Sequence, residues 1–215
     1  MYGSIHIDRS LAGRVTLICI LILFATYITA EENTELFSSD GYRITDFRSP
    51  VPDTVPSGFT VTTQQVQKLL QDDDVILIDV LPAPIKPKDR PSGLLWLPPE
   101  RHNIPGSVWL PNVGYGALSD ELEVYFKVNL AKYSAGDKSR KIIVYCQADC
   151  WMSWNAAKRA ATCFGYTQIY WYPDGTTGWE AAGLHRKRVW PSRWTSNELY
   201  LYFTDDGEQV GSPAY

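Results

Sequence analysis

The sequence has few of the residues that build metal centres and little of the positive charge that binds nucleic acid. It contains three histidines and four cysteines among 215 residues, and its net charge is −4. An acidic balance provides no basic surface for a nucleic acid. A zinc site needs a full set of thiolate and imidazole ligands, and the scattered residues His6, His102 and His185 do not complete one with the cysteines. We therefore expect neither a nucleic acid partner nor a metal site, and no pattern names a cofactor.

Residues 1–30 have the composition of a secretory signal. The apolar run Val15 to Ile28 follows two arginines, and Ala30 provides a small residue ahead of two glutamates. We expect export to the periplasm, an oxidising compartment that permits disulfides, and no stable membrane association once the signal is cleaved. An uncleaved anchor is the alternative, because Ile28 fits the usual cleavage pattern poorly.

The remaining chain divides into three parts by composition. Residues 31–58 are polar and rich in turn-forming residues, which predicts an extended N-terminal arm lying on the domain. Residues 59–185 form the main domain, and residues 186–215 form a C-terminal extension. Within the domain, Leu81 to Pro111 holds eight of the 14 prolines and several large apolar residues. This composition predicts an ordered lid over the edge of a sheet.

Helix and strand patterns alternate through the main domain. Helices are predicted at Val61 to Gln71, Ser119 to Lys132 and Ser153 to Ala160, and strands at Val75 to Val80, Lys141 to Tyr145 and Gln168 to Tyr172. This alternation predicts an α/β fold with a parallel sheet and covering helices. Ligands bind such sheets at the carboxyl ends of the strands, where the predicted strands place Asp79 and Cys146. We expect Asp79 to accept hydrogen bonds from loop amides there, and residues 173–179 to flank the same edge.

Cys146 lies where a buried strand, rich in β-branched residues, meets a short loop and a helix. Ser153 is the predicted N-cap of that helix. We expect the free N–H groups of the loop and of the first helical turn to face Cys146 and to favour its thiolate. The loop and pocket residues expected around it are Gln147, Ala148, Asp149, Trp151, Met152, Ser153, Asn155 and Asp79.

Cys150 follows Cys146 in the pattern C-x-x-x-C-W. A disulfide needs Cα atoms within about 7 Å of each other, and a short curled loop meets that requirement. Cys19 lies in the predicted signal. Cys163, late in the helix beside Phe164, is expected to be a buried small hydrophobic residue.

Several of these segments resemble a rhodanese-like domain, an open parallel sheet with helices on both faces. The resemblance covers roughly Phe59 to Leu184. It includes the strand LIDV, the element IPGSV and the active-site half YCQADCWMSWNAAKRA. The sequence is most similar to an exported rhodanese-related family with a Cys-Trp motif, associated with catabolism through PQQ-dependent alcohol dehydrogenases. The motifs YRITDFRSPVPDTV, DVLPAPIKP, IPGSVWLPNVGYGALS and YPDGTTGW carry that similarity.

The resemblance implies that Cys146 is a sulfur-transfer nucleophile and that the partner is an exported quinoprotein or its electron-transfer partner. The sequence departs from the rhodanese pattern in several places. Asn103 stands where a histidine is usual, and Leu81 where an arginine is frequent. The loop carries Asp149, whose charge opposes both a thiolate and an anionic sulfur donor.

Three roles remain open for the two cysteines. Cys146 alone carries a persulfide in sulfur transfer, or Cys146 acts as nucleophile with Cys150 as the resolving thiol in redox chemistry. The third role is non-catalytic, with a structural disulfide in a binding module. A bridge over so short a loop gains only about 2 kcal/mol of chain entropy, so stability alone is a weak reason for it.

Overall fold

A computed structural model describes residues 36–72, 74–83 and 101–192 of the chain. The predicted signal, most of the predicted proline-rich lid and most of the C-terminal extension lie outside these residues. Within the described residues, no helix is both long and apolar enough to cross a membrane.

A five-stranded sheet forms the centre of the domain. Its strands run in the order β1-β6-β5-β2-β4, and every neighbouring pair is parallel. The bounds are Phe59–Thr60 for β1, Val75–Asp79 for β2, Val108–Trp109 for β4, Lys141–Tyr145 for β5 and Ile169–Tyr172 for β6. The predicted parallel sheet is therefore confirmed. The edge strands β1 and β4 are short, and in each strand only two residues form pairs with the neighbouring strand.

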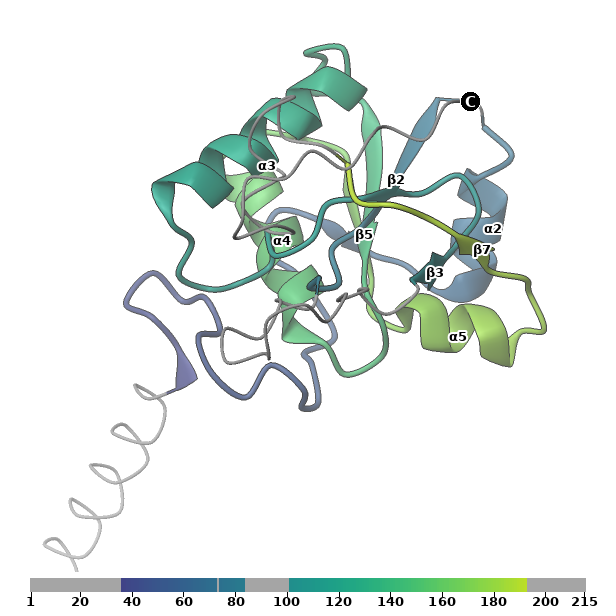
Figure 1. Cartoon of the computed structure of the whole chain (residues 1–215), viewed down its shortest axis with the longest axis horizontal. Coiled ribbons are helices and arrows are strands. Elements are labelled where there is room, and N and C mark those ends of the chain that lie inside the picture. The colour runs from purple at the N-terminus through teal and green to yellow at the C-terminus, as the bar shows by residue number, and fades with distance from the viewer. Residues whose placement is uncertain (1–35, 73, 84–100, 193–215) are drawn as a thin grey trace, which may run out of the picture.

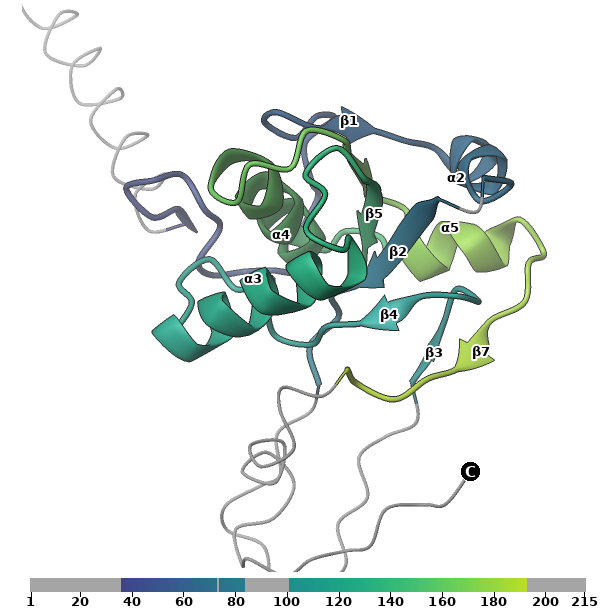
Figure 2. The same cartoon turned by 90° about the horizontal axis from the view of Figure 1, so that it is seen from above.

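Helices cover both faces of the sheet, as Figures 1 and 2 show. The bounds are Thr63–Leu69 for α2, Asp120–Tyr133 for α3, Trp151–Thr162 for α4 and Gly175–Ala181 for α5. Helices α3 and α4 lie on one face, and α2 and α5 lie on the other. Each face has its own core, because successive residues of a strand point to opposite sides. Ile142 and Val144 of β5 pack toward α4, whereas Ile143 and Tyr145 join the core with α2 and α5.

Local sequence determines where two of these helices begin. Thr62 caps α2 in a capping box, in which Gln65 Oε1 accepts from the Thr62 amide at 2.8 Å. Ser119 caps α3, whose first turn carries three acidic residues that favour the positive end of the helix. Both helices were predicted, and both exist.

The predicted start of α4 is wrong. The helix begins at Trp151 with Cys150 as its N-cap, so Ser153 lies within the first turn. Its hydroxyl donates to Cys150 O at 3.0 Å and accepts from Trp171 Nε1 at 3.1 Å. The hydroxyl thus finds its partners in the core. Trp151 and Met152, the two residues before Ser153, are buried, and this packing extends the helix to include them.

A second, two-stranded sheet extends the domain beyond the predicted elements. Strand β3 (His102–Asn103) pairs antiparallel with β7 (Lys187–Arg188). After β7 the chain continues along the edge strand β4, where Ser192 N donates to Trp109 O at 2.8 Å. The first residues of the C-terminal extension are therefore part of the packed structure.

Candidate functional site

Cys146 and Cys150 are joined by a disulfide at the carboxyl edge of the sheet. Cys146 follows β5 directly, and Cys150 precedes the first residue of α4. Their Cα atoms lie 6.6 Å apart. The expectation that the curled loop brings the two residues within bridging distance is confirmed.

Both sulfur-bearing residues are buried. Cys146 is 0% exposed and Cys150 is 1% exposed, and both belong to the core cluster between the sheet and α3 and α4. The Cys146 side chain therefore faces the interior of the protein. A reactant reaches the disulfide only if some covering part of the structure moves.

The expected ring of amide donors around Cys146 is not what the structure has. The Sγ atom of Cys146 lies 3.5 Å from the carbonyl oxygen of Gln147 and 3.8 Å from that of Cys150. The Ala148 amide donates instead to Thr177 Oγ1 at 3.2 Å, and the Trp151 amide donates to Phe47 O at 3.0 Å. Carbonyl oxygens disfavour a negative charge on a nearby sulfur, so this surrounding suits a thiol or a disulfide better than a thiolate.

The start of α5 presses against the backbone of Cys146. The amide and the hydroxyl of Thr176 both donate to Cys146 O, at 3.1 and 3.2 Å. Gln147 forms an isolated bridge with Gly175, and a Cβ built on Gly175 would lie 2.7 Å from Cys146 C and O. Residues 173–179 flank the predicted edge, although Gly175–Ala181 form a helix there.

The remaining loop residues differ in exposure. Met152 is buried, Gln147 and Ala148 are half-buried, and Asp149 is exposed. Asp149 has a φ of 51°, a left-handed conformation that an aspartate tolerates better than most side chains. Because Asp149 is exposed, solvent and salt screen its charge, which weakens its repulsion of a thiolate or an anionic donor.

The N-terminal arm binds the first turns of α4 on the side away from the sheet. Trp151 Nε1 donates to Pro50 O at 3.0 Å and to Ser49 Oγ at 3.1 Å, and Trp154 Nε1 donates to Thr54 O at 2.9 Å. The Arg43 guanidinium lies 5.1 Å from the centre of the Trp151 ring. The tryptophan of the Cys-Trp motif is thus an anchor for the arm.

Asn155 binds the arm through its backbone. Its Oδ1 accepts from Arg43 N at 3.0 Å, and its Nδ2 donates to Arg43 O at 2.8 Å and to Gly114 O at 3.0 Å. The side chain is fully buried with both ends paired. Asn155 was predicted to lie in the site, but its partners are the arm and the 113–116 loop rather than the cysteine loop.

Asp79 forms a second polar group at the same sheet edge. Its Oδ1 accepts from the Leu81 amide at 2.9 Å, which confirms the predicted bond to a loop amide. Its Oδ2 accepts from Arg101 Nε at 2.9 Å, and Arg101 Nη2 forms a closer ion pair with the same oxygen. Burial raises the pKa of Asp79 to about 6, although the Arg101 charge and the Leu81 amide both lower it. Sequence reasoning missed Arg101; the signal available was that a buried carboxylate requires a positive partner.

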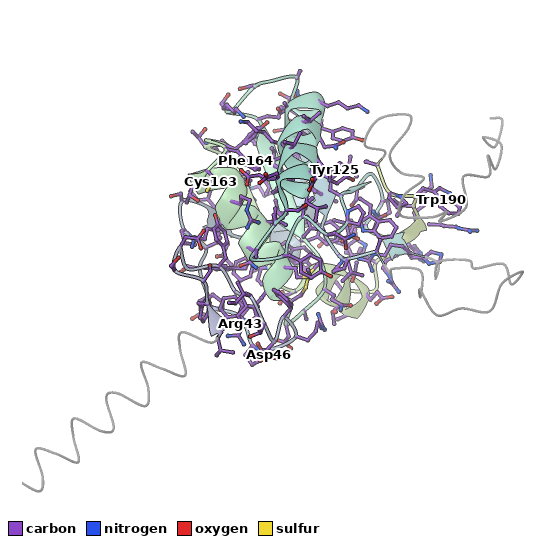
Figure 3. The ribbon with its side chains drawn as sticks, turned by 60° about the vertical axis from the view of Figure 1, so that its left-hand side comes forward. Arg43, Asp46, Tyr125, Cys163, Phe164 and Trp190 are labelled. Carbon is purple, nitrogen blue, oxygen red and sulfur yellow. A yellow bond between two sulfur atoms is a disulfide. The ribbon has the colours of Figure 1, made fainter. Side chains whose placement is uncertain are left out.

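The expected burial of Cys163 is wrong. Cys163 is exposed at the C-cap of α4, and its Sγ lies 3.3 Å from the Tyr42 hydroxyl. Burial and this contact raise the pKa of Tyr42 to about 12. Figure 3 shows Cys163 and Phe164 together at this end of the helix, with Arg43 and Asp46 lying apart from them at the arm. Cys163 is therefore separate from the disulfide site.

A protein-family comparison matches residues 62–182 to the rhodanese-like domain. The chain belongs to the rhodanese-like domain family. No curated protein sequence matches the chain.

The solved structures to which this rhodanese-like chain is similar share little sequence with it. The polysulfide-sulfur transferase homodimer from Wolinella succinogenes is 21% identical, with a TM-score of 0.39, over 61% of this chain and 79% of that one. A thiosulfate sulfurtransferase from Pseudomonas aeruginosa is 16% identical, with a TM-score of 0.41, over 65% of this chain and 22% of that one. EanB with the substitution T414A, in complex with hercynine, is 19% identical, with a TM-score of 0.44, over 70% of this chain and 36% of that one.

Proposed function

We propose that this rhodanese-like protein performs thiol redox or sulfur-transfer chemistry at Cys146, with Cys150 as the resolving thiol. The observation that carries the proposal is the disulfide between a cysteine at the end of β5 and a cysteine at the start of α4. A second thiol within bonding distance has no task in simple persulfide carriage, but it is what a reversible dithiol needs.

Between the two chemistries, the surroundings of Cys146 favour thiol–disulfide exchange. A persulfide held for transfer is anionic, and it needs hydrogen-bond donors. The oxygen contacts of Cys146 Sγ are instead the carbonyl groups of Gln147 and Cys150. A neutral disulfide has no such requirement, so the oxidised pair is the state that these contacts accommodate.

Thiol–disulfide exchange needs only the two protein thiols and a substrate disulfide. In the reduced protein, the Cys146 thiol, which the carbonyl groups of Gln147 and Cys150 keep neutral at rest, gives its proton to solvent as it attacks one sulfur of a substrate disulfide; it forms a mixed disulfide and displaces one substrate thiolate. Cys150 then loses its proton to that thiolate and attacks Cys146 Sγ, which forms the internal disulfide and displaces the second substrate thiolate. Two electrons pass from the protein to the substrate. A dithiol substrate drives the same steps in reverse.

We place this chemistry in the periplasm, as an accessory to a PQQ-dependent alcohol oxidation system. The support for export is the N-terminal sequence pattern, together with a disulfide that an oxidising compartment would maintain. The support for an exported quinoprotein, or its electron-transfer partner, as the binding partner is the sequence resemblance alone.

One observation favours a second candidate function, a non-catalytic binding module. Both cysteines are almost completely buried, which is typical of a structural bridge. In this alternative the disulfide holds the loop between β5 and α4 in shape, and the surface of the domain binds the partner.

The reduction potential of the Cys146–Cys150 pair tests the proposal. Redox use predicts a potential above about −300 mV in glutathione or dithiothreitol buffers, with the reduced protein transferring electrons to a disulfide substrate. Mass spectrometry after treatment with polysulfide would detect a persulfide on Cys146 if sulfur transfer occurs. The matched controls are Cys146→Ser, which must lose the reaction, and Cys163→Ser, which must keep it. A potential well below that value, with no persulfide, would establish the binding module instead.

A further inference from the structure

The burial of the disulfide raises the question of how a reactant reaches it. The sheet, α3, α4 and α5 around the pair are regular structure. Two segments beside them are not. One is the loop 113–116, which contacts Met152 at Gly114, and the longer one is the N-terminal arm, which between Phe37 and Gly58 contains no helix or strand, only an isolated bridge from Phe37 to Arg43. Segments without a hydrogen-bonded ladder of their own open at lower free energy than the elements they cover.

The arm packs directly on the cluster that contains the cysteines. Val55 belongs to that cluster, and Phe47 and Val51 pack against it. Phe47 also accepts the amide proton of Trp151, the residue next to Cys150. Lifting the arm therefore removes a covering layer from the helix end where the disulfide lies, while the sheet and α5 stay in place.

We infer that Arg43 and Asn155 are positioning residues that hold the arm closed and thereby control access to the disulfide. The Arg43 side chain is 7% exposed. Its guanidinium donates to Thr45 O and to the carboxylate of Asp46, and it lies 5.2 Å from the Phe37 ring centre and 5.1 Å from the Trp151 ring centre. The Arg43 guanidinium thus contacts several residues of the arm and also the tryptophan that follows Cys150 (Figure 3 shows Arg43 and Asp46 together).

Asn155 fixes the same residue by its backbone. Its amide pairs with both Arg43 N and Arg43 O, across 112 residues of sequence. Because all these bonds converge on Arg43, loss of its guanidinium or of the Asn155 amide loosens one shared attachment. This inference rests on the proposed function, because control of access to the disulfide matters only if the disulfide reacts with a partner.

The rate at which the folded protein is reduced tests this inference. The full chain is treated with the irreversible phosphine reductant TCEP under conditions in which it stays folded. Free thiols are then alkylated, and the intact mass measures the reduced fraction over time. Arg43→Met keeps much of the side-chain bulk but removes the guanidinium. Asn155→Ala removes the side-chain amide that pairs with the backbone of Arg43. We expect both to be reduced at least tenfold faster than the wild type. Arg140→Met, at the opposite end of β5 where Arg140 Nη2 pairs with Asp74, should stay within about twofold.

The urea dependence of the wild-type rate provides a second readout that a general loss of stability would not reproduce. Opening of the arm alone predicts a slope much shallower than that of global unfolding, because little surface is exposed. A slope equal to that of global unfolding, or unchanged rates in both folded variants, would overturn the inference. If the variants do not fold, the wild-type slope alone decides. The phosphine reaction does not depend on the reduction potential, so failure of the proposed redox function leaves this result unaffected.

Discussion

The guanidinium of Arg101 forms an ion pair with the buried carboxylate of Asp79, 22 residues earlier in the chain. Asp79 ends β2, and Arg101 lies just before β3. The pair connects the central sheet to the loop region that leads into the small β3–β7 sheet. Its energy depends on pH because the Asp79 carboxyl, whose pKa burial raises to about 6, takes up a proton as the pH falls below that value.

The stability of the protein should fall as pH rises from about 4 to 6. Burial raises the pKa of Asp79 from 3.8 to about 6, so in this window the folded state binds a proton that the unfolded state has released. Stability then decreases with pH, and the decrease is complete once the pH passes the folded pKa. A shift of this size corresponds to about 2 to 3 kcal/mol. Urea unfolding at several pH values measures the slope.

The Asp79→Asn variant should lack this component of the slope, because its side chain does not titrate. Asp74→Asn, which changes the exposed carboxylate paired with Arg140, should keep it. If the wild type instead gains stability with pH across the window and Asp79→Asn does not, the attraction of Arg101 outweighs the cost of burial.

The Ser153 hydroxyl links the start of α4 to β6. It donates to Cys150 O and accepts from Trp171 Nε1, and both Ser153 and Trp171 are fully buried. Ser153→Ala leaves the indole N–H without an acceptor in the core, which should cost about 1 to 3 kcal/mol of unfolding free energy. Thr162→Val removes an exposed hydroxyl from the same helix and should change stability by less than about 1 kcal/mol. Chemical denaturation of both variants makes the comparison, and equal costs would contradict the assigned role of Ser153.

The central strands and two helix starts could be predicted because their signals are local. The β-branched runs of β2 and β5 indicate burial, and the caps Thr62 and Ser119 each satisfy an amide only three residues away. The closeness of Cys146 and Cys150 is also local, since a loop of three residues has few ways to keep them apart. These features depend little on the rest of the fold.

Two of the errors, on Ser153 and Asn155, share one cause, which is dependence on residues far away in sequence. Ser153 is of a residue type that is common at N-caps, but the hydrogen bond from the Trp171 indole and the packing of Trp151 place it inside the helix. The partners of Asn155 lie 112 residues away in the arm and 41 residues away at Gly114. No short-range pattern encodes such contacts, and two-residue strands such as β3 carry too few residues to show a period.

The contact between Gly175 and Cys146 should make position 175 intolerant of any side chain. Gly175 has a φ of 49°, and a Cβ there would lie 2.7 Å from the Cys146 carbonyl group. Gly136 also has a left-handed backbone, with a φ of 80°, but a Cβ there would meet nothing within 4 Å. Gly136→Ala therefore measures the conformational cost alone, about 1 to 2 kcal/mol.

Gly175→Ala should cost clearly more than Gly136→Ala, by about 1 to 3 kcal/mol, because the backbone of Cys146 or of α5 must shift to admit the methyl group. The shift also moves the carbonyl oxygen that accepts from Thr176, so the disulfide of the folded variant should react with TCEP at an altered rate. Urea unfolding and reduction kinetics measure the two effects. Equal stabilities for the two alanine variants, with an unchanged reduction rate, would show that α5 does not hold the cysteine loop in place.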